Sequence, residues 1–238
     1  MRCRLCLAEG DLRKSHILPE FLYSAVYDGK HQFITIPLEP GEPERLHQKG
    51  LRERLLCPSC EQLLGKHERF ASQLIFHQSG LDFVRTERTL HVPGVDYVAF
   101  RLFTLSLLWR MGESSHSAFA DVRLGPHAER IRMMLLTGNP GKPHQYPCVV
   151  RAVIWRKEQL RGAIIPSGKV MVRGYAAYRL LCAGFFWTFY VSSHLTDSAV
   201  GRAVIREDGI LPLHIMPDAQ VEHFVRSVAA LMPDEPEA

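Results

Sequence analysis

The sequence predicts an α+β protein, with an N-terminal module over residues 1–90 and a helical plus antiparallel β-sheet domain over residues 91–238. Three observations predict this organisation. Two Cys-x2-Cys pairs enclose most of the first part, and their members are Cys3, Cys6, Cys57 and Cys60. Turn residues at 91–94 (His-Val-Pro-Gly) mark a boundary. Beyond that boundary, apolar segments of helical length are followed by segments typical of strands.

The first part contains two predicted helices and one predicted strand. Residues 20–27 have helical spacing, and residues 31–38 alternate in the manner of an exposed strand before the turn-rich stretch 39–44. Residues 61–77 predict a longer helix that ends near 79–80. The side chains that recur in this helix at steps of three and four residues are Leu63, His67, Phe70 and Leu74.

The second part begins with two predicted helices. The first covers residues 97–111, and the second opens at Gly125-Pro126 and runs to Leu136, since proline suits the first turn, where no N–H donor is needed. A last helix begins at Pro217-Asp218, before an acidic tail. The predicted strands of the antiparallel sheet are residues 148–155, 162–165, 170–174, 179–192 and 209–216.

Composition limits the classes of function that fit this chain. Its 238 residues are 46% apolar, enough to fill an ordinary core. The net charge of +4 is evenly spread, with 13 Lys/Arg against 12 Asp/Glu in residues 1–90 and 16 against 13 in the remainder. Neither part is a polycation. Any contact with nucleic acid therefore depends on a local basic patch.

The chain has no apolar segment typical of a secretory signal or a membrane span. The longest apolar run, residues 180–191, has 12 residues, whereas a transmembrane helix needs roughly 20. We therefore expect a cytoplasmic protein without membrane contact. Because thiols stay reduced in that compartment, the six cysteines do not indicate a disulfide framework. Cys148 and Cys182 lie in apolar segments and are predicted to be small core residues.

The four paired cysteines predict a structural zinc site. Zinc prefers four tetrahedral ligands, and each Cys-x2-Cys turn presents two thiolates at a separation that suits one ion. The 50-residue gap between Cys6 and Cys57 leaves room for a strand, a loop and a helix between the two pairs. Unrelated cysteine pairs or a redox motif are the alternative. A redox motif would lie where a strand is followed by a helix, and neither pair occupies a recognisable position of this kind in the sequence.

A Ser15-His16-Ile17-Leu18-Pro19 element lies between the cysteine pairs, and Glu61 directly follows the second pair. With these residues the chain resembles HNH nucleases of the ββα-metal type, which are built on a treble-clef zinc scaffold. The resemblance covers the four cysteines, His16, Pro19 and the start of the helix at Glu61.

The resemblance implies a role for each of these residues. His16 would be the general base that takes a proton from the attacking water, and its ordinary pKa near 6.5 suits that task. Glu61 would hold a catalytic Mg²⁺ or Mn²⁺, because hard cations prefer oxygen ligands. Ser15 stands where these nucleases commonly have Asp, so it would assist the metal only through its hydroxyl or a bound water. Glu61 itself replaces the usual Asn or His.

The chain looks closer to a broader HNH-like group that shares several further motifs. These are the Ser-His-Ile-x-Pro element, a Gln-x-Gly turn at 48–50, Leu-Cys-x2-Cys-Glu at 56–61 and the downstream Glu68. Trp109-Arg110 and Leu124 to His127 also resemble it. On a helix, Glu61 and Glu68 fall within about 20° of one another but about 10.5 Å apart along the axis, which is too far for routine binding of one ion.

Each of these residues also has a structural interpretation. His16 could pack against the cysteine turns, Glu61 could be a first-turn acid favoured by the helix dipole, and His67 could simply be a packed histidine. The basic residues beside the second pair could hold phosphates or form a salt-bridged surface. They are Arg52, Arg54, Lys66 and Arg69. The aromatic run at 185–190 is interpreted as a buried strand.

The sequence thus predicts a metal-dependent, HNH-like endonuclease that hydrolyses phosphodiester bonds in DNA, with RNA the second choice, around a structural zinc held by four cysteines. The alternative is a catalytically inactive zinc-binding treble-clef module that binds nucleic acid or protein. Residues 91–238 are assigned substrate recognition, homo-oligomerisation or contact with a regulatory partner.

Overall fold

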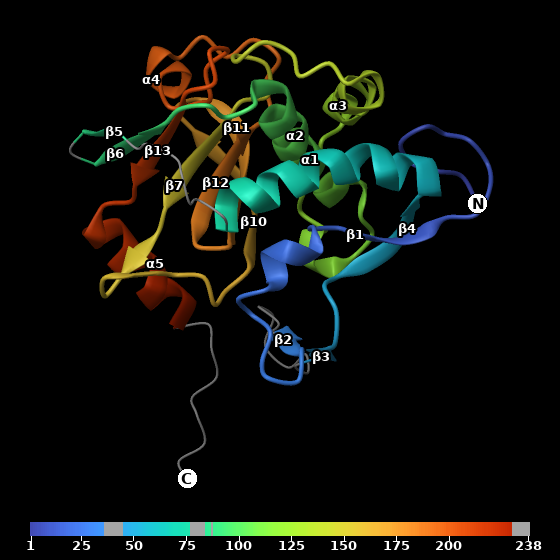
Figure 1. Cartoon of the computed structure of the whole chain (residues 1–238), viewed down its shortest axis with the longest axis horizontal. Coiled ribbons are helices and arrows are strands. Elements are labelled where there is room, and N and C mark those ends of the chain that lie inside the picture. The colour runs from blue at the N-terminus through green and yellow to red at the C-terminus, as the bar shows by residue number, and fades with distance from the viewer. Residues whose placement is uncertain (36–44, 77–83, 87, 230–238) are drawn as a thin grey trace.

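A computed structural model describes residues 1–35, 45–76, 84–86 and 88–229 (Figure 1). The fold is mixed α+β, as predicted. Three features of the sequence prediction lie outside the described residues. They are the turn-rich stretch 39–44, the end of the long helix near 79–80 and the acidic tail at 234–237.

Two short antiparallel ribbons and one long helix make up most of the N-terminal part. Strand β1 (Arg13–His16) pairs with β4 (Arg52–Leu56), and β2 (Phe33–Thr35) pairs with β3 (Arg45–His47). Helix α1 (Pro58–Phe76) starts at the second cysteine pair. Figure 1 shows the β2–β3 ribbon set apart from the large sheet.

Seven strands form the main sheet, in the order β10-β11-β12-β7-β13-β6-β5. Their bounds are Val84–Thr86 (β5), Thr89–Val92 (β6), Cys148–Ala152 (β7), Ile165–Val172 (β10), Tyr175–Cys182 (β11), Phe185–Tyr190 (β12) and Leu211–Ile215 (β13). The predicted antiparallel pattern holds for five neighbouring pairs, whereas β13 and β7 run parallel. A small hairpin joins β8 (Ile154–Trp155) to β9 (Glu158–Gln159).

Helix α2 (Tyr97–Glu113) lies between α1 and the main sheet. Its apolar residues surround the whole helix rather than one stripe, which is typical of a buried helix. On one side it packs along α1, and on the other Phe100 and Phe103 contact Trp187 of β12. The remaining helices are α3 (Pro126–Thr137), α4 (Ser198–Gly201) and α5 (Asp218–Ala229), with short 3-10 turns η1 (Glu20–Tyr23) and η2 (Ser117–Phe119).

Several local predictions differ from the structure, among them the two strands expected over residues 162–165 and 170–174, which form one strand, β10. Residues 20–27 were expected to be helical, but only the four-residue turn η1 forms. The single strand expected over residues 179–192 is a hairpin of β11 and β12, because Ala183 and Gly184 both adopt positive φ angles, 52° and 79°, and reverse the chain. The turn signal at 91–94 overlaps β6, so the predicted boundary at residue 90 falls within a strand of the main sheet.

The two parts of the chain share one apolar core and a buried charge. The largest core cluster includes Leu18 and Leu55 from the first part and Trp187 from the second. Arg110 of α2, whose side chain is 1% exposed, donates to the carbonyl of His16 at 2.8 Å and forms an ion pair with Glu68 of α1. The N-terminal part is therefore packed against residues 91–238 through both apolar and charged contacts.

We predict that Glu68→Gln destabilises the fold by about 3 kcal/mol, because it leaves the buried guanidinium of Arg110 without a counter-charge. The free energy of unfolding, measured by urea titration, checks this. Glu222→Gln is the matched control, since the Glu222–Arg226 pair is exposed and its loss should cost less than about 1 kcal/mol. Equal effects of the two substitutions would contradict the role given to Arg110.

Candidate metal centre and basic groove

The four paired cysteines meet in one cluster. Their sulfur atoms all lie within 4.8 Å of one another, and Sγ of Cys6 is 3.7 Å from Sγ of Cys57. Tetrahedral zinc with Zn–S bonds of about 2.3 Å requires sulfur atoms roughly 3.8 Å apart. All four thiols are free of disulfides. The prediction that the two pairs form one ligand group is confirmed, and the group fits a structural zinc.

Backbone hydrogen bonds hold both cysteine turns in place. In the first turn, the N–H of Cys3 donates to Ala8 at 2.9 Å, and Leu7 takes a positive φ of 63° that closes the loop. The N–H of Arg4 donates to the carbonyl of Leu55 in β4. The N–H of Cys57 then points at Sγ of Cys3, 3.4 Å away. The first turn is thus fixed to the strand that delivers the second.

The electrostatic surroundings favour thiolates at part of this cluster. The Ser59 hydroxyl, 3.1 Å from Sγ of Cys57, lowers the pKa of Cys57 to about 6. Burial raises the pKa of Cys60. Arg132 of α3 binds the carbonyl of Leu5 and lies close enough to Cys6 for their charges to interact. A cation here offsets the excess negative charge that four thiolates bring to a divalent ion.

Ser15 forms a hydrogen bond at the start of the second cysteine turn. Its side chain is 1% exposed, and its hydroxyl accepts the N–H of Leu56 at 3.1 Å. Leu56 is the last residue of β4 and immediately precedes Cys57. The Ser15 hydroxyl therefore joins β1 to the start of the second turn, whereas a role beside a catalytic metal stays a prediction.

His16 is paired with a carboxylate that was not predicted from the sequence. Its Nε2 lies 2.8 Å from Oε2 of Glu20, and the His16 side chain is 28% exposed. Burial lowers the pKa of His16, with Arg52 and Arg110 acting in the same direction and Glu20 and Glu68 opposing them. The ring is therefore mostly neutral at pH 7 and able to accept a proton.

Glu20 is itself held by a small network. The Tyr27 hydroxyl donates to Oε1 of Glu20 at 2.7 Å, and accepts the N–H of Gly50 at 2.8 Å. Burial alone would raise the pKa of Glu20, but Tyr27, His16, Gly50 and His31 together lower it. Only the spacing of four residues between His16 and Glu20 hinted at this pair. Residues four apart come together on a helix, but His16 ends the strand β1, so the spacing alone did not predict this pair.

Gly50 belongs to the predicted Gln-x-Gly turn at 48–50. A Cβ at Gly50 would lie 2.6 Å from the Tyr23 ring, so a larger residue would push this ring away. The Tyr23 hydroxyl in turn accepts the N–H of Leu51. The glycine therefore allows the turn to approach η1, which carries Glu20.

Glu61 lies in the first turn of α1, and its Oε1 is buried without a hydrogen-bond partner among the described residues. His16 makes its carboxylate contact with Glu20 instead, and Glu68 binds Arg110. Across the described ranges, the four cysteines are the only group of three or more Cys, His, Asp or Glu with ligand atoms this close together. Neither His16 nor Glu61 belongs to such a group among the described residues, and their role beside a second ion stays a prediction.

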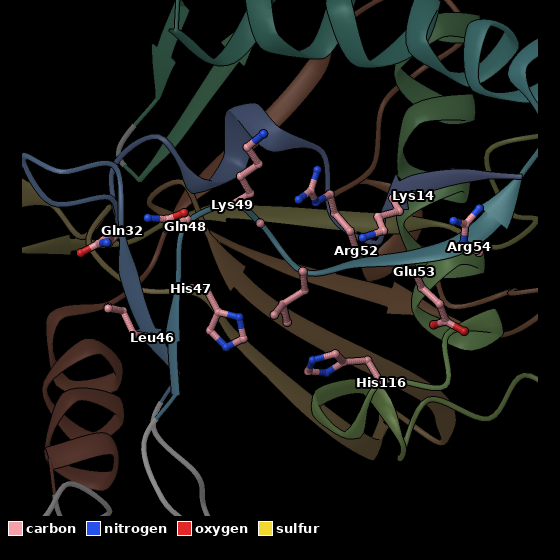
Figure 2. A pocket seen from close by; sticks show the side chains of 12 residues that line it. Lys14, Gln32, Leu46, His47, Gln48, Lys49, Arg52, Glu53, Arg54 and His116 are labelled. Carbon is pink, nitrogen blue, oxygen red and sulfur yellow. The ribbon is translucent and has the colours of Figure 1, made fainter.

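An open groove of about 1000 Å³ lies along the β1–β4 ribbon (Figure 2). Its basic side chains are Lys14, Lys49, Arg52 and Arg54. The rings of His47 and His116 point toward one another in Figure 2, and burial lowers the pKa of each. Of the four basic residues named beside the second cysteine pair, Arg52 and Arg54 line this groove and Lys66 and Arg69 do not, and a role in holding phosphates stays a prediction.

Comparison of the chain with family models, with curated proteins and with solved structures finds no match. None of the helices in the described part of the chain is long and apolar enough to cross a membrane.

We predict that the purified protein contains about one zinc per chain, and that Cys57→Ser lowers this content well below stoichiometry by removing a ligand. Elemental analysis after gel filtration measures it. The control is Cys182→Ser, which alters a buried thiol of β11 outside the cluster and should leave the zinc content unchanged. Equal zinc in both variants would contradict the assignment.

The His16–Glu20 pair predicts a titration that NMR can follow. His16 should protonate with a midpoint below about 6.5, and Glu20→Gln should lower the midpoint further, because the Glu20 charge favours the imidazolium. Since the unfolded chain binds this proton more readily, His16 should reduce stability as the pH falls below about 6.5. A midpoint at or above that value, or no change in Glu20→Gln, would contradict the pairing.

Proposed function

We propose that residues 1–90 form a zinc-stabilised HNH-like module of the treble-clef, ββα-metal type, and that it hydrolyses phosphodiester bonds in DNA. One observation carries this proposal: His16, beside Glu20, shares a face of the β1–β4 ribbon with Lys14, Arg52 and Arg54. The order of the first cysteine turn, the β1–β4 ribbon and α1 along the chain supports the treble-clef part of this proposal.

The strand register supports this common face. His16 is directly opposite Arg52, and Lys14 is directly opposite Arg54. Residues opposite one another in an antiparallel pair project on the same side, as do residues two apart on one strand. A nucleic-acid backbone lying along the ribbon would therefore meet three cations and the His16 ring together. Arg and Lys contacts of this kind position phosphates.

The chemistry assigned to His16 is proton transfer. A neutral imidazole accepts a proton from an attacking water, and a carboxylate beside the other nitrogen stabilises the imidazolium that forms. Nε2 of His16 faces Glu20. Nδ1 has no partner among the described residues, so it is the nitrogen that we assign to the water.

A divalent cation would neutralise the charge that develops on the phosphate during hydrolysis. Glu61 is the residue that we assign to hold Mg²⁺ or Mn²⁺, because its buried oxygen lacks a hydrogen-bond partner among the described residues. An oxygen ligand suits both ions.

The alternative is a catalytically inactive zinc module that binds nucleic acid or protein. Two observations favour it. The Ser15 hydroxyl, at the position of the usual second acidic ligand, is occupied by the N–H of Leu56. In addition, the described residues hold no second cluster of three or more ligands. The groove would then bind a strand without cutting it.

We predict that zinc-loaded protein cleaves DNA when Mg²⁺ or Mn²⁺ is added, and that His16→Ala lowers the rate by about 100-fold or more, the usual contribution of a general base. Gel electrophoresis of end-labelled single-stranded and duplex DNA, with RNA of the same sequence, measures cleavage. His223→Ala on the exposed face of α5 is the control and should cleave at the wild-type rate.

Zinc content and thermal unfolding of each variant show whether the fold is intact. Absence of metal-dependent cleavage by zinc-loaded wild-type protein would overturn the nuclease and leave the binding module. Cleavage that persists at the wild-type rate in His16→Ala would assign the activity to another group or to a contaminant.

A further inference from the structure

We propose that the basic groove binds an unpaired, single-stranded segment of nucleic acid, with its phosphates against β1 and β4 and an exposed base against His47. This inference rests on the proposed function and defines its substrate class. Single-stranded DNA and RNA share this chemistry, a phosphodiester backbone with accessible base faces.

Uncompensated charge is the first observation behind this inference. Within the described part of the chain, none of the four groove cations forms an ion pair, whereas Arg110, Arg132 and Arg173 each do. The one groove carboxylate, Glu53, is occupied. It accepts hydrogen bonds from both Ser115 N–H and hydroxyl and from the Ser114 hydroxyl, at 2.8–2.9 Å. The groove therefore presents a net positive charge.

Two of these cations repel one another when no ligand is bound. Lys14 and Arg54 are direct cross-strand partners, and like charges in that position destabilise an antiparallel pair. Arg54 relieves little of this, since its hydrogen bond goes to the neutral carbonyl of Leu12. A polyanion along the ribbon would convert the repulsion into binding energy, and Lys49 and Arg52 extend the same surface.

The opposite wall of the groove offers a surface for a base. The His47 ring stacks on Phe33 with centroids 5.1 Å apart and an angle of 21°. Its Nε2 lies 3.1 Å from Oγ1 of Thr35, which fixes the ring plane. Leu46 beside it is 61% exposed. The stacked ring faces His116 across the groove in Figure 2.

The combination of these walls favours a single strand over a duplex. Aromatic rings contact the faces of bases, and in a duplex those faces are covered by the neighbouring base pairs. The lining of the groove of about 1000 Å³ combines cations with a fixed ring, and Figure 2 shows Lys49 and Arg52 on the other side of β4 from His47, so that only a flexible strand bending around the ribbon would contact both. A duplex on this surface would reach the cations but not the ring.

We predict that zinc-loaded full-length protein, without added Mg²⁺ or Mn²⁺, binds single strands at least about 10-fold more tightly than the duplex of the same sequence. Fluorescence anisotropy with labelled DNA and RNA strands of about 12 nucleotides measures this. His47→Ala should weaken single-strand binding by about 5- to 150-fold, the range expected for loss of one stacked base, and should leave duplex binding unchanged.

The contribution of the cations to binding is measured by the salt dependence of the affinity. Lys14→Gln with Arg54→Gln should reduce the slope of log K against log salt by about 1.4 for single strands, or about 0.7 per lost phosphate contact. The matched control is Arg156→Gln with Lys157→Gln, at the exposed turn of the β8–β9 hairpin, which should keep the wild-type slope.

Duplex binding as tight as single-strand binding, or a wild-type slope in the Lys14/Arg54 variant, would overturn the inference. The same measurements distinguish a failure of this inference from a failure of the proposed function. Groove-dependent binding of single strands with no cleavage under Mg²⁺ or Mn²⁺ supports the groove and removes the nuclease. His16-dependent cleavage of duplex by a protein that does not prefer single strands supports the nuclease and removes this inference.

Discussion

Four sulfur atoms from two turns separated by 50 residues meet in one cluster that fits a zinc ion, and the positions of β1, β4 and α1 are linked to this cluster. The first turn is bonded to β4 through Arg4 and Leu55, and the second begins α1. Zinc binding would supply much of the folding energy of so small a unit. Because His16 ends the strand that pairs with β4, its distance from α1 is set by the same cluster.

Residues 91–238 contribute side chains to the N-terminal site. Arg110 from α2 supports the backbone of His16, and Arg132 from α3 places a cation near Cys6. Ser114 and Ser115, at the end of α2, occupy the carboxylate of Glu53. The buried or paired arginines thus hold the fold, while the cations of the groove are left available to a ligand. This division of charge links the second part of the chain to the chemistry proposed for the first.

Sequence patterns predicted the features that depend on local spacing. The Cys-x2-Cys pairs predicted the ligand cluster, apolar periodicity predicted α1, apolar composition α2, and proline at the helix start α3 and α5. The His16–Glu20 pair was not predicted, because it depends on how the chain turns through η1. Arg110 lies 94 residues from its partner carbonyl, and no local pattern reports such a contact. The parallel pairing of β13 with β7 is equally non-local. Catalysis by His16 and Glu61 stays a prediction.

Amide hydrogen exchange of zinc-loaded and chelator-treated protein tests most directly whether the cysteine cluster positions the site. Removal of zinc should strip protection from β1, β4 and the first turn of α1, since the metal is the strongest link between the two cysteine turns. Strands β11 and β12, in the centre of the second part, should stay protected. Unchanged protection of β1 and β4 without zinc would contradict the account, because the ribbon that carries His16 and the groove would then be held by other contacts.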